Sequence, residues 1–117
     1  VGATEHAVVL YRDKLPKFNN NGKMIFNWME WPRDNITPKI HPTQKPIPLI
    51  KKLISIFTDE GDVVIDPVAG SGSTLKAAAE TNRHSYGFEV YKPFYEDAQN
   101  IMLNSIQLSF TLGQVMM

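Results

Sequence analysis

Residues 66–74 read Asp-Pro-Val-Ala-Gly-Ser-Gly-Ser-Thr, and their types and order are suited to holding an anionic ligand. They follow an apolar run at 63–65 that predicts a buried strand, and they precede an alanine-rich run that predicts a helix. A carboxylate and a glycine-rich turn therefore arrive together at the amino end of a helix, where backbone N–H groups point at bound anions. Because open α/β sheets bind ligands at such strand ends, the segment predicts a cofactor site.

The glycine pattern narrows the kind of ligand. A P-loop places a lysine after its second glycine, whereas Ser73 follows Gly72 here, which disfavours nucleoside triphosphates. A dinucleotide fingerprint places a third glycine where this chain has Leu75. What remains is Gly-x-Gly with an acid, Glu89, nineteen residues after Gly70. A carboxylate at a strand end can accept both hydroxyls of a ribose, so the pattern favours an adenosine-containing ligand.

Each of these residues also has a purely structural interpretation. Gly70 and Gly72 are equally typical of a tight turn between a strand and a helix. Asp66 alone is suited to capping a helix, and Glu89 alone to ending a strand in solvent. The cofactor interpretation is favoured because the two acids fall at the ends of neighbouring strands.

A second motif, His-Pro-Thr-Gln-Lys-Pro at 41–46, stands immediately before a predicted helix. Its two prolines restrict the backbone and present Thr43, Gln44 and Lys45 from a stiff, extended loop. Lys45 beside the amino end of a helix is suited to a carboxylate ligand. A single histidine such as His41 is more often a packing or hydrogen-bonding residue than a ligand.

The elements that position these motifs are predicted from apolar periodicity and from proline and glycine breaks. In order they are a strand at 6–11, an irregular segment at 12–40, a helix at 46–57, a strand at 63–66, a helix at 73–81, a strand at 85–89 and a helix from 93 to about 103. Residues 24–31 read as a short strand or a packed loop, and the alternation of Leu108, Phe110 and Leu112 allows one more strand. The last helix is predicted to turn four residues inward: Phe94, Ala98, Ile101 and Met102. Successive strand–helix units predict an α/β fold with a parallel sheet covered by helices.

Charge divides the chain into two halves. The net charge is zero, but residues 1–58 hold nine Lys and Arg against four Asp and Glu, a balance of +5, and residues 59–117 hold three against eight, a balance of −5. A basic half is suited to nucleic acid, although ordinary surface scatter gives the same count. There is no cysteine for a disulfide or a thiolate metal site, and no apolar run is long enough to span a membrane.

Two tryptophans, Trp28 and Trp31, lie in the basic half among Lys23, Arg33 and Lys39. Interleaved aromatic and basic side chains can stack on bases and pair with phosphates. Tryptophans in such a segment are more often anchors of a core or a loop, so the sequence leaves both interpretations open.

Three segments, in this order and spacing, resemble one known family. The segments 41–46, 66–74 and 87–89 (Gly-Phe-Glu) are similar to the C-terminal half of DNA amino-methyltransferases, which methylate adenine N6 or cytosine N4. The similarity runs from 41 to about 102, and residues 4–11 weakly resemble a late antiparallel strand of the same fold. The resemblance implies a partial Rossmann-like methyltransferase fold, with parallel strands, crossover helices and an antiparallel strand.

The resemblance implies S-adenosylmethionine as the cofactor. The methionine end would be held by Asp66, Gly70 and Gly72, and the ribose hydroxyls by Glu89. Val68 departs from the phenylalanine that many relatives carry, which reduces apolar contact with the cofactor. Two residues of the hexapeptide would close over the methionine carboxylate, and no metal is implied. The complete set of implied cofactor-binding residues is Thr43, Lys45, Asp66, Pro67, Gly70, Ser71, Gly72, Thr74 and Glu89.

The family also requires a segment of the Asp-Pro-Pro-Tyr type, whose acceptors orient the target amine and whose aromatic ring stacks on the flipped base. None of the eight prolines is adjacent to another, so no catalytic residue is assigned. The nearest pattern, residues 92–95, is interpreted as the start of a helix. The resemblance therefore places the catalytic strand upstream of Val1.

Together these inferences predict a site-specific DNA methyltransferase with adenine N6 as its preferred target. Residues 1–40 would form an N-terminal strand and an irregular basic segment, and residues 41–117 the cofactor-binding part. The expected nucleic-acid partner is double-stranded DNA with a flipped base. The expected protein partner is either a second copy of the chain or a missing N-terminal half. The expected location is the cytoplasm of a bacterium or a phage-infected cell. The alternatives are a cytosine-N4 enzyme, a non-catalytic binding module, and an RNA or small-molecule methyltransferase, which the hexapeptide disfavours.

Overall fold

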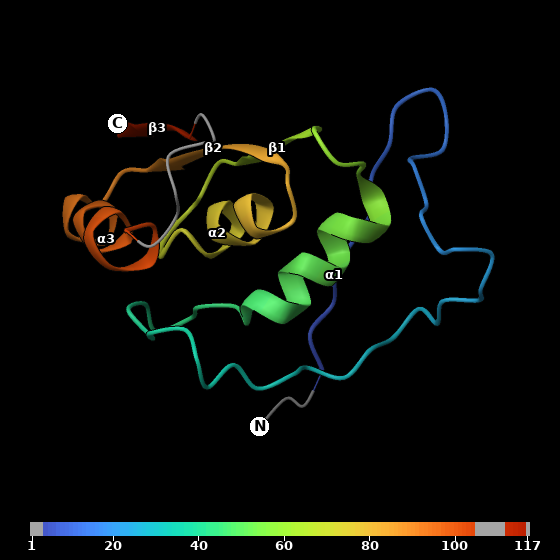
Figure 1. The fold of residues 1–117 in the computed structure, drawn as a ribbon, viewed down its shortest axis with the longest axis horizontal. Coiled ribbons are helices and arrows are strands. Elements are labelled where there is room, and N and C mark those ends of the chain that lie inside the picture. The colour runs from blue at the N-terminus through green and yellow to red at the C-terminus, as the bar shows by residue number, and fades with distance from the viewer. Residues whose placement is uncertain (1–3, 105–111, 117) are drawn as a thin grey trace.

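The computed structural model describes residues 4–104 and 112–116. The elements are α1 (Ile47–Phe57), β1 (Val63–Asp66), α2 (Ser73–Glu80), β2 (His84–Glu89), α3 (Lys92–Asp97), the π-helical turn η1 (Ala98–Met102) and β3 (Leu112–Met116). Figure 1 shows the helices on one side of the sheet and a long N-terminal segment that runs past α1. The predicted helices and the strands at 63–66 and 85–89 are confirmed to within about two residues at each end.

Local sequence explains where the first two helices begin and end. Pro46 precedes α1, and a further proline occupies its first turn, where a missing N–H costs no hydrogen bond. The helix α2 begins after Gly72 and is followed by Asn82, whose φ of 60° is one that asparagine tolerates better than most residues.

The core lies between α1, α2 and the inner face of the sheet. The alanine-rich face of α2 is fully buried at Ala77 and Ala78, which lets α1 approach closely. Leu75 and Met102 fill the remaining space and are 1% and 0% exposed. Arg83 is also buried, and its guanidinium donates to the carbonyls that follow α1 and α2, where cations are favoured.

The three strands are all parallel, in the order β1-β2-β3. Asp66 pairs in register with Gly87, so both strand ends reach the same edge of the sheet. The outer face of the sheet is uncovered in the described chain, where Val63 is 54% and Ile65 63% exposed. One side of β1 also pairs with no other described strand. Parallel sheets are ordinarily covered on both faces, so this sheet presents an open face and an open edge.

Several predictions made for the flanking regions are wrong. No strand forms at 6–11, and the described residues contain no antiparallel strand. Residues 24–31 form a loop, one of the two interpretations given, but Met24 and Phe26 are exposed rather than packed. A strand needs a hydrogen-bonding partner, and no described strand pairs with 6–11, where Val8 and Leu10 are more than 80% exposed. Ile101, predicted to face inward, is 44% exposed, because the widened turn η1 rotates it outward. Leu108 and Phe110 lie outside the described residues, and β3 begins at Leu112.

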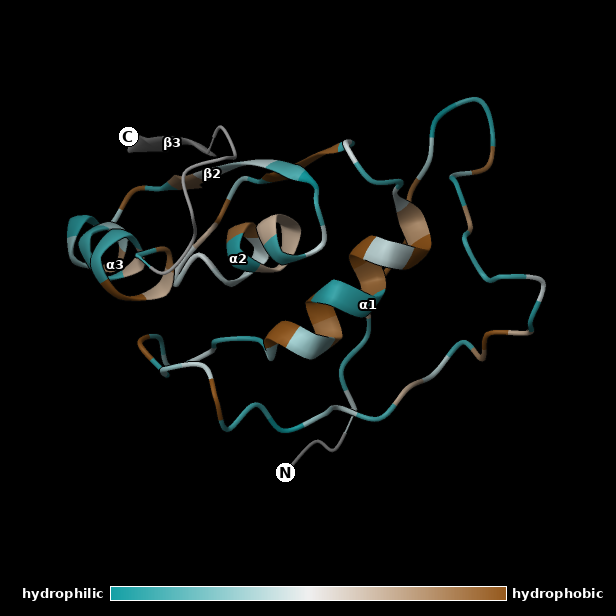
Figure 2. Cartoon of the chain, viewed as in Figure 1, coloured by the Kyte–Doolittle hydropathy of each residue, from teal (hydrophilic) through white to brown (hydrophobic). Residues whose placement is uncertain are grey.

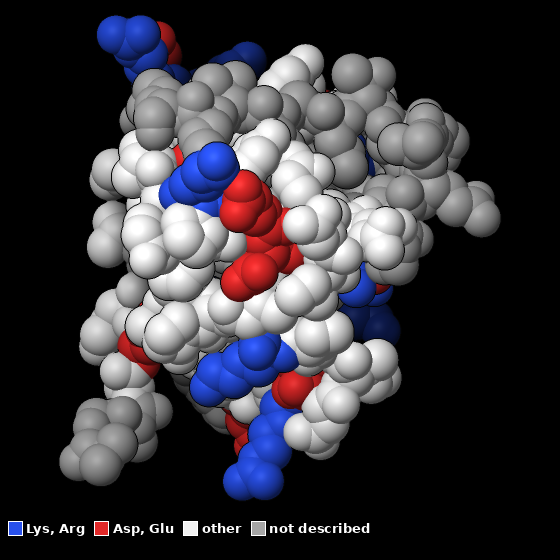
Figure 3. Space-filling model, turned by 90° about the vertical axis from the view of Figure 1, so that its left-hand side faces the viewer, with Lys and Arg blue, Asp and Glu red and all other residues white. Residues whose placement is uncertain are grey.

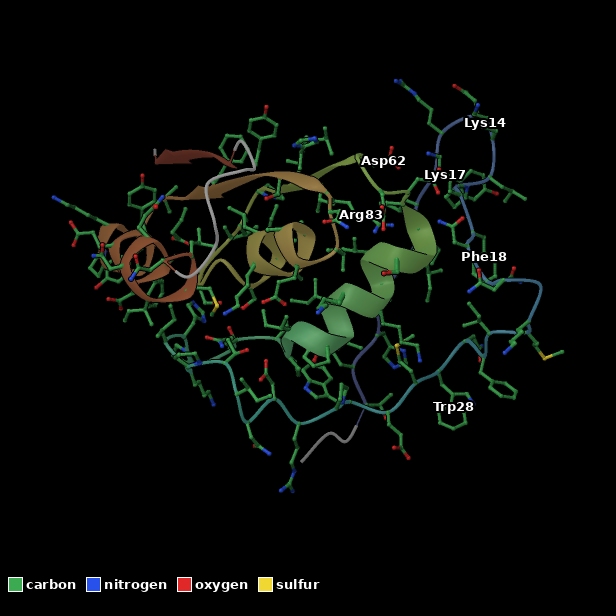
Figure 4. All side chains as sticks on the ribbon, viewed as in Figure 1. Lys14, Lys17, Phe18, Trp28, Asp62 and Arg83 are labelled. Atoms are coloured by element: carbon green, nitrogen blue, oxygen red, sulfur yellow. The ribbon has the colours of Figure 1, made fainter. Side chains whose placement is uncertain are left out.

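The irregular N-terminal segment is attached to the carboxyl end of α1. Asn19 donates from its backbone to the Ile56 carbonyl at 2.7 Å and from its side chain to the Thr58 carbonyl at 2.7 Å. The ammonium of Lys17 lies 2.8 Å from the Asp59 carboxylate and 3.1 Å from that of Asp62 (Figure 4). The Lys17 contacts raise the pKa of Lys17 and lower the pKa of Asp59. The pKa of Asp62 is lowered first by the backbone N–H of Asp59, which donates to its carboxylate, and then by Lys17.

The same segment is attached to the amino end of α1 by Asp34. Its carboxylate accepts from the N–H of Ile47, the first residue of the helix, at 3.1 Å, and from Thr37 and Ile36 at 2.9 and 3.2 Å. Burial raises the pKa of Asp34, but these donors outweigh burial and hold that pKa below its ordinary value. Asp34 thus caps a helix thirteen residues further along the chain.

Among the described residues no helix is long and apolar enough to cross a membrane.

Candidate functional site

The predicted strand–turn–helix arrangement is present. Residues 67–72 form a turn between the end of β1 and the start of α2, and both glycines have positive φ, 54° at Gly70 and 79° at Gly72. Side chains other than glycine rarely adopt these angles, so the two glycines are required by the backbone path. Across the turn, β2 ends at Glu89, which lies on the same edge of the sheet as Asp66.

A small hollow with a free volume of about 10 Å³ opens at this edge. Its floor includes Gly87, where an added Cβ would lie 2.6 Å from Leu75 and 3.0 Å from Ala69. Gly87 therefore lets the turn and α2 approach β2, a packing role that the linear sequence did not indicate. The lining residues are Ala69, Gly70, Gly72, Leu75, Gly87, Glu89, Tyr95, Ala98 and Leu103.

Glu89 makes the most informative contacts in the hollow. One carboxylate oxygen accepts the backbone N–H of Gly70 at 2.8 Å, and the other accepts that of Tyr91 at 2.8 Å. Asp66 accepts the N–H of Val68 at 3.0 Å, so its carboxylate also stabilises the turn. Neither acid takes the structural role considered for it, because no side chain caps α2 and the half-buried Glu89 accepts from two backbone N–H groups instead of ending its strand in solvent.

Most of the turn's backbone donors are already occupied. Besides Val68 and Gly70, Ala69 donates to the Phe88 carbonyl and Gly72 to that of Ala69, each at 2.8 Å. The helix α2 makes its first backbone hydrogen bond from Lys76 to Gly72. The N–H groups of its first turn therefore lie beyond the helical ladder, and they are the donors that a helix offers to an anion.

The remaining residues of the turn differ in exposure. Ser71 and Ser73 are buried, and their hydroxyls hydrogen-bond to each other at 2.6 Å. Thr74 is half-buried at the start of α2, and Pro67 is exposed on the outer side of the turn. All the predicted turn residues thus lie together at one strand-end edge.

The hexapeptide packs against this turn through His41. The His41 ring lies 4.3 Å from the Phe94 ring and would be 3.5 Å from a Cβ at Gly70. The His41 Nδ1 atom accepts the N–H of Thr43 at 3.2 Å, and the Thr43 hydroxyl lies equally close to it. This confirms the packing and hydrogen-bonding role favoured for His41, which contacts Thr43 on one side and the glycine turn on the other.

Lys45 lies elsewhere. Its ammonium pairs with Glu5 at 2.6 Å and sits 5.1 Å above the Trp31 ring. The structure therefore does not bring Lys45 together with the other predicted residues, because the hexapeptide directs Lys45 and His41 toward different neighbours. Trp31 acts here as the partner of a cation in a loop.

Lys45 lines a second, more open hollow of about 230 Å³, which it forms with residues between 31 and 39. Sequence reasoning did not identify this hollow, whose walls come from the segment before the hexapeptide and from the hexapeptide itself. Figure 3 shows that basic and acidic side chains lie next to each other on the face of the molecule that includes α3. The lining residues are Trp31, Pro32, Arg33, Asp34, Asn35, Thr37, Lys39, Gln44, Lys45 and Pro46.

Within residues 4–104, no group of three or more acidic or histidine side chains is arranged to hold a metal ion.

Comparison with known proteins gives consistent matches. A family model described as DNA methylase matches residues 8–100. The Type II methyltransferase M.HindIII of Haemophilus influenzae is 50% identical over 60 residues, which cover 51% of this chain and 19% of that protein. The DNA adenine methyltransferase YhdJ of Escherichia coli is 34% identical over 90 residues, 74% of this chain and 31% of its own length. The chain thus spans less than a third of these relatives.

Solved structures give the same fold. TTHA0409 from Thermus thermophilus, complexed with S-adenosyl-L-methionine, superposes with a TM-score of 0.53 at 34% identity, covering 60% of this chain and 28% of that one. The M1.HpyAVI–SAM complex superposes with a TM-score of 0.60 at 32% identity, covering 72% and 41%. The predicted α/β methyltransferase fold is therefore confirmed.

Proposed function

Because this chain belongs to the DNA methylase family, we propose that it binds S-adenosylmethionine at the glycine turn and orients its methyl group toward an exocyclic amine of DNA. The observation that carries this proposal is the pair of strand-end acids flanking a turn with two positive-φ glycines. The solved relatives named above were determined with S-adenosylmethionine, which supports the choice of cofactor.

The proposed roles follow from the chemistry of the cofactor. Asp66 is suited to binding the ammonium group of the cofactor. The first turn of α2, together with Ser71 and Thr74, is suited to binding its carboxylate. Glu89 is suited to the ribose hydroxyls, while Pro67, Gly70 and Gly72 shape the turn. Thr43 reaches the site through His41. A contact between Lys45 and the cofactor requires its ammonium to leave Glu5, so we place Lys45 on the DNA side of the hexapeptide instead.

Adenine N6 is the proposed target. The relative YhdJ, which matches 74% of this chain, is named a DNA adenine methyltransferase. Such an enzyme must extrude the target base from the duplex before methyl transfer. Cytosine N4 is the alternative, and methylation of a duplex by the complete protein, followed by nucleoside analysis, distinguishes N6-methyladenine from N4-methylcytosine.

The second hollow is the proposed contact with DNA. Its three cations, Arg33, Lys39 and Lys45, and the Trp31 ring suit a strand that carries both phosphates and bases. The Asp34 carboxylate in the same hollow is occupied by backbone donors.

The DNA contact can be measured through its salt dependence. Arg33→Ala and Lys39→Ala should each weaken duplex binding and reduce the slope of log affinity against log salt by about one. The matched control is Lys92→Ala, because Lys92 pairs with Glu96 on α3. Equal losses from all three variants would contradict the assignment of this surface.

Cofactor binding is tested by calorimetry on the 117-residue chain. We expect saturable heat on titration with S-adenosylmethionine, and binding weakened roughly 10- to 100-fold by Glu89→Ala, since hydrogen bonds to a charged acceptor are lost. Glu60→Ala, in the exposed turn before β1, is the control. The chain has no Asp-Pro-Pro-Tyr type segment, so we propose that it binds but does not methylate. Absence of heat at millimolar ligand would favour an inert module instead.

The open edge and outer face of the sheet support one further part of the proposal. Val63, Ile65 and Tyr86 leave an apolar surface beside the unpaired side of β1. We propose that the remainder of a methyltransferase domain covers it, and that the isolated chain self-associates there. Sedimentation of the chain as a stable monomer would contradict self-association.

A further inference from the structure

We infer that Glu89 is a positioning residue for the glycine turn, in addition to its proposed contact with the ribose. Its carboxylate ties the turn after β1 to the backbone that leads from β2 into α3, before any ligand arrives. This inference rests on the proposed function for the identity of the ligand, but the tie itself is a property of the ligand-free chain.

The geometry of the tie is specific. Oε2 accepts from Gly70, at the apex of the turn, and Oε1 from Tyr91, the residue that precedes α3, and both distances are 2.8 Å. Hydrogen bonds from two N–H groups to one carboxylate are charge-assisted and fix the carboxylate plane. A neutral or shorter side chain cannot serve both donors equally.

The tie reassigns the role of Gly70. Its N–H is occupied by Glu89, so Gly70 contributes to the site by holding the carboxylate rather than by donating to the anionic end of the ligand. Each carboxylate oxygen retains a second acceptor position, and these positions can receive the two ribose hydroxyls without releasing either backbone donor. The acid is therefore oriented for the sugar in advance, which lowers the ordering cost of binding.

The Tyr91 side of the tie connects the turn to the aromatic residues beside it. Tyr91 packs edge-on against Phe94 at 4.8 Å, and Phe94 packs against His41 of the hexapeptide. One carboxylate thus connects the turn, the start of α3 and the hexapeptide. Substitution of Glu89 should loosen Gly70, Tyr91 or both, while the backbone bond from Ala69 to Phe88 remains.

The test is amide hydrogen exchange, followed by NMR on the ligand-free 117-residue chain. Glu89→Gln and Glu89→Asp should each accelerate exchange at Gly70 or Tyr91 by roughly tenfold or more, as expected for loss of a charge-assisted hydrogen bond. Exchange at Ala69 and Gly61 reports on the body of the fold and should change little. Glu60→Gln is the matched control and should leave exchange at Gly70, Tyr91 and Ala69 unaltered.

Two results would overturn the inference. One is unchanged exchange at both Gly70 and Tyr91 in every Glu89 variant that is folded. Circular dichroism of Glu89→Asp and Glu89→Gln shows which of them is folded. The other is a uniform acceleration of all four amides, which would mean that Glu89 supports only global stability. Addition of S-adenosylmethionine should leave Gly70 protected, and its deprotection would mean that the ligand breaks the tie. Because exchange is measured without ligand and calorimetry with it, failure of the tie and failure of cofactor binding are separable.

Discussion

The two halves of the described chain are held together by different physical means. From 41 to 104, backbone hydrogen bonds in strands and helices enclose a packed core, and every fully buried apolar side chain of the described residues lies between Ile47 and Leu103. From 4 to 40 there is no regular element, and apolar side chains such as Val8, Leu10 and Met24 are exposed. Figure 2 shows apolar residues recurring along this N-terminal segment, away from the core.

The difference shows how far a few polar contacts can substitute for a packed hydrophobic core. The N-terminal segment is joined to both ends of α1 mainly by a few polar groups, Asn19 and Lys17 at one end and Asp34 at the other. One aromatic contact, between the rings of Phe18 and Phe57 at 6.0 Å, adds to them. Such contacts determine where a chain passes, but they bury little apolar surface. The proposed cofactor site lies in the packed half, and the proposed DNA surface lies where the two halves meet.

The comparison is tested most strongly by one substitution made in each half. Leu75→Ala should lower the free energy of unfolding by about 2–5 kcal/mol, because Leu75 is 1% exposed and no neighbour can fill the space. Leu15→Ala should change it by less than about 0.5 kcal/mol, because Leu15 is 75% exposed. Urea unfolding measures both values, and similar losses at the two sites would mean that the halves form a single core.

The next largest effect on stability is expected at Gly87, which is closely packed beneath the glycine turn. Gly87→Ala should destabilise the chain by about 1–3 kcal/mol, since the added methyl group would lie within 3.0 Å of Leu75 and Ala69. At Gly22, where nothing lies within 4 Å, the same change meets only the strain of a positive φ. Thermal unfolding of the two variants separates steric cost from conformational cost, and a larger loss at Gly22 would contradict the packing role of Gly87.

The Asp34 attachment predicts a pH dependence. Asp34→Ala should cost about 1 kcal/mol at neutral pH, because the N–H of Ile47 loses its cap. The folded-state pKa of Asp34 lies below its unfolded value, so the stabilisation is complete above the unfolded pKa, about 3.9, and is lost as pH falls through the folded value. The difference between wild type and variant should therefore shrink below about pH 4. A constant difference in urea titrations down to acid pH would contradict the charge-based account.

The smallest effect on stability is expected at Trp28. Its ring is 66% exposed, stacks on Phe26 at 5.9 Å and, in Figure 4, points away from α1. Trp28→Ala should change stability by less than about 0.5 kcal/mol. It should weaken binding of single-stranded DNA by roughly 1–3 kcal/mol if the exposed ring stacks on a base. Fluorescence anisotropy with a labelled oligonucleotide measures the second value, and an unaltered affinity would return Trp28 to the role of a loop residue.

Prediction from sequence succeeded where the determining residues are contiguous. The strand–turn–helix at 63–80 follows from an apolar run, two glycines and an alanine-rich stretch, and the structure contains it. The strand at 6–11 was predicted by the same reasoning and is absent, because β-propensity describes a side chain that suits a sheet and supplies no partner strand. Lys45 was assigned to the cofactor from the family resemblance, and its place before a helix suited a carboxylate. Its position in the structure depends on Glu5 and Trp31, which local spacing does not reveal.

The amino-acid sequence alone determined the order of the elements, the need for glycine at Gly70 and Gly72, and the arrival of two acids at neighbouring strand ends. These features depend on backbone angles and periodicity, which short stretches of chain encode. Only the tertiary structure decided which groups those acids bind, that Gly87 must lack a side chain, and that Asp34 caps α1. The reason is that each of these contacts joins segments separated by a dozen residues or more, or depends on how neighbouring elements pack, and no local pattern specifies which donor will meet which acceptor.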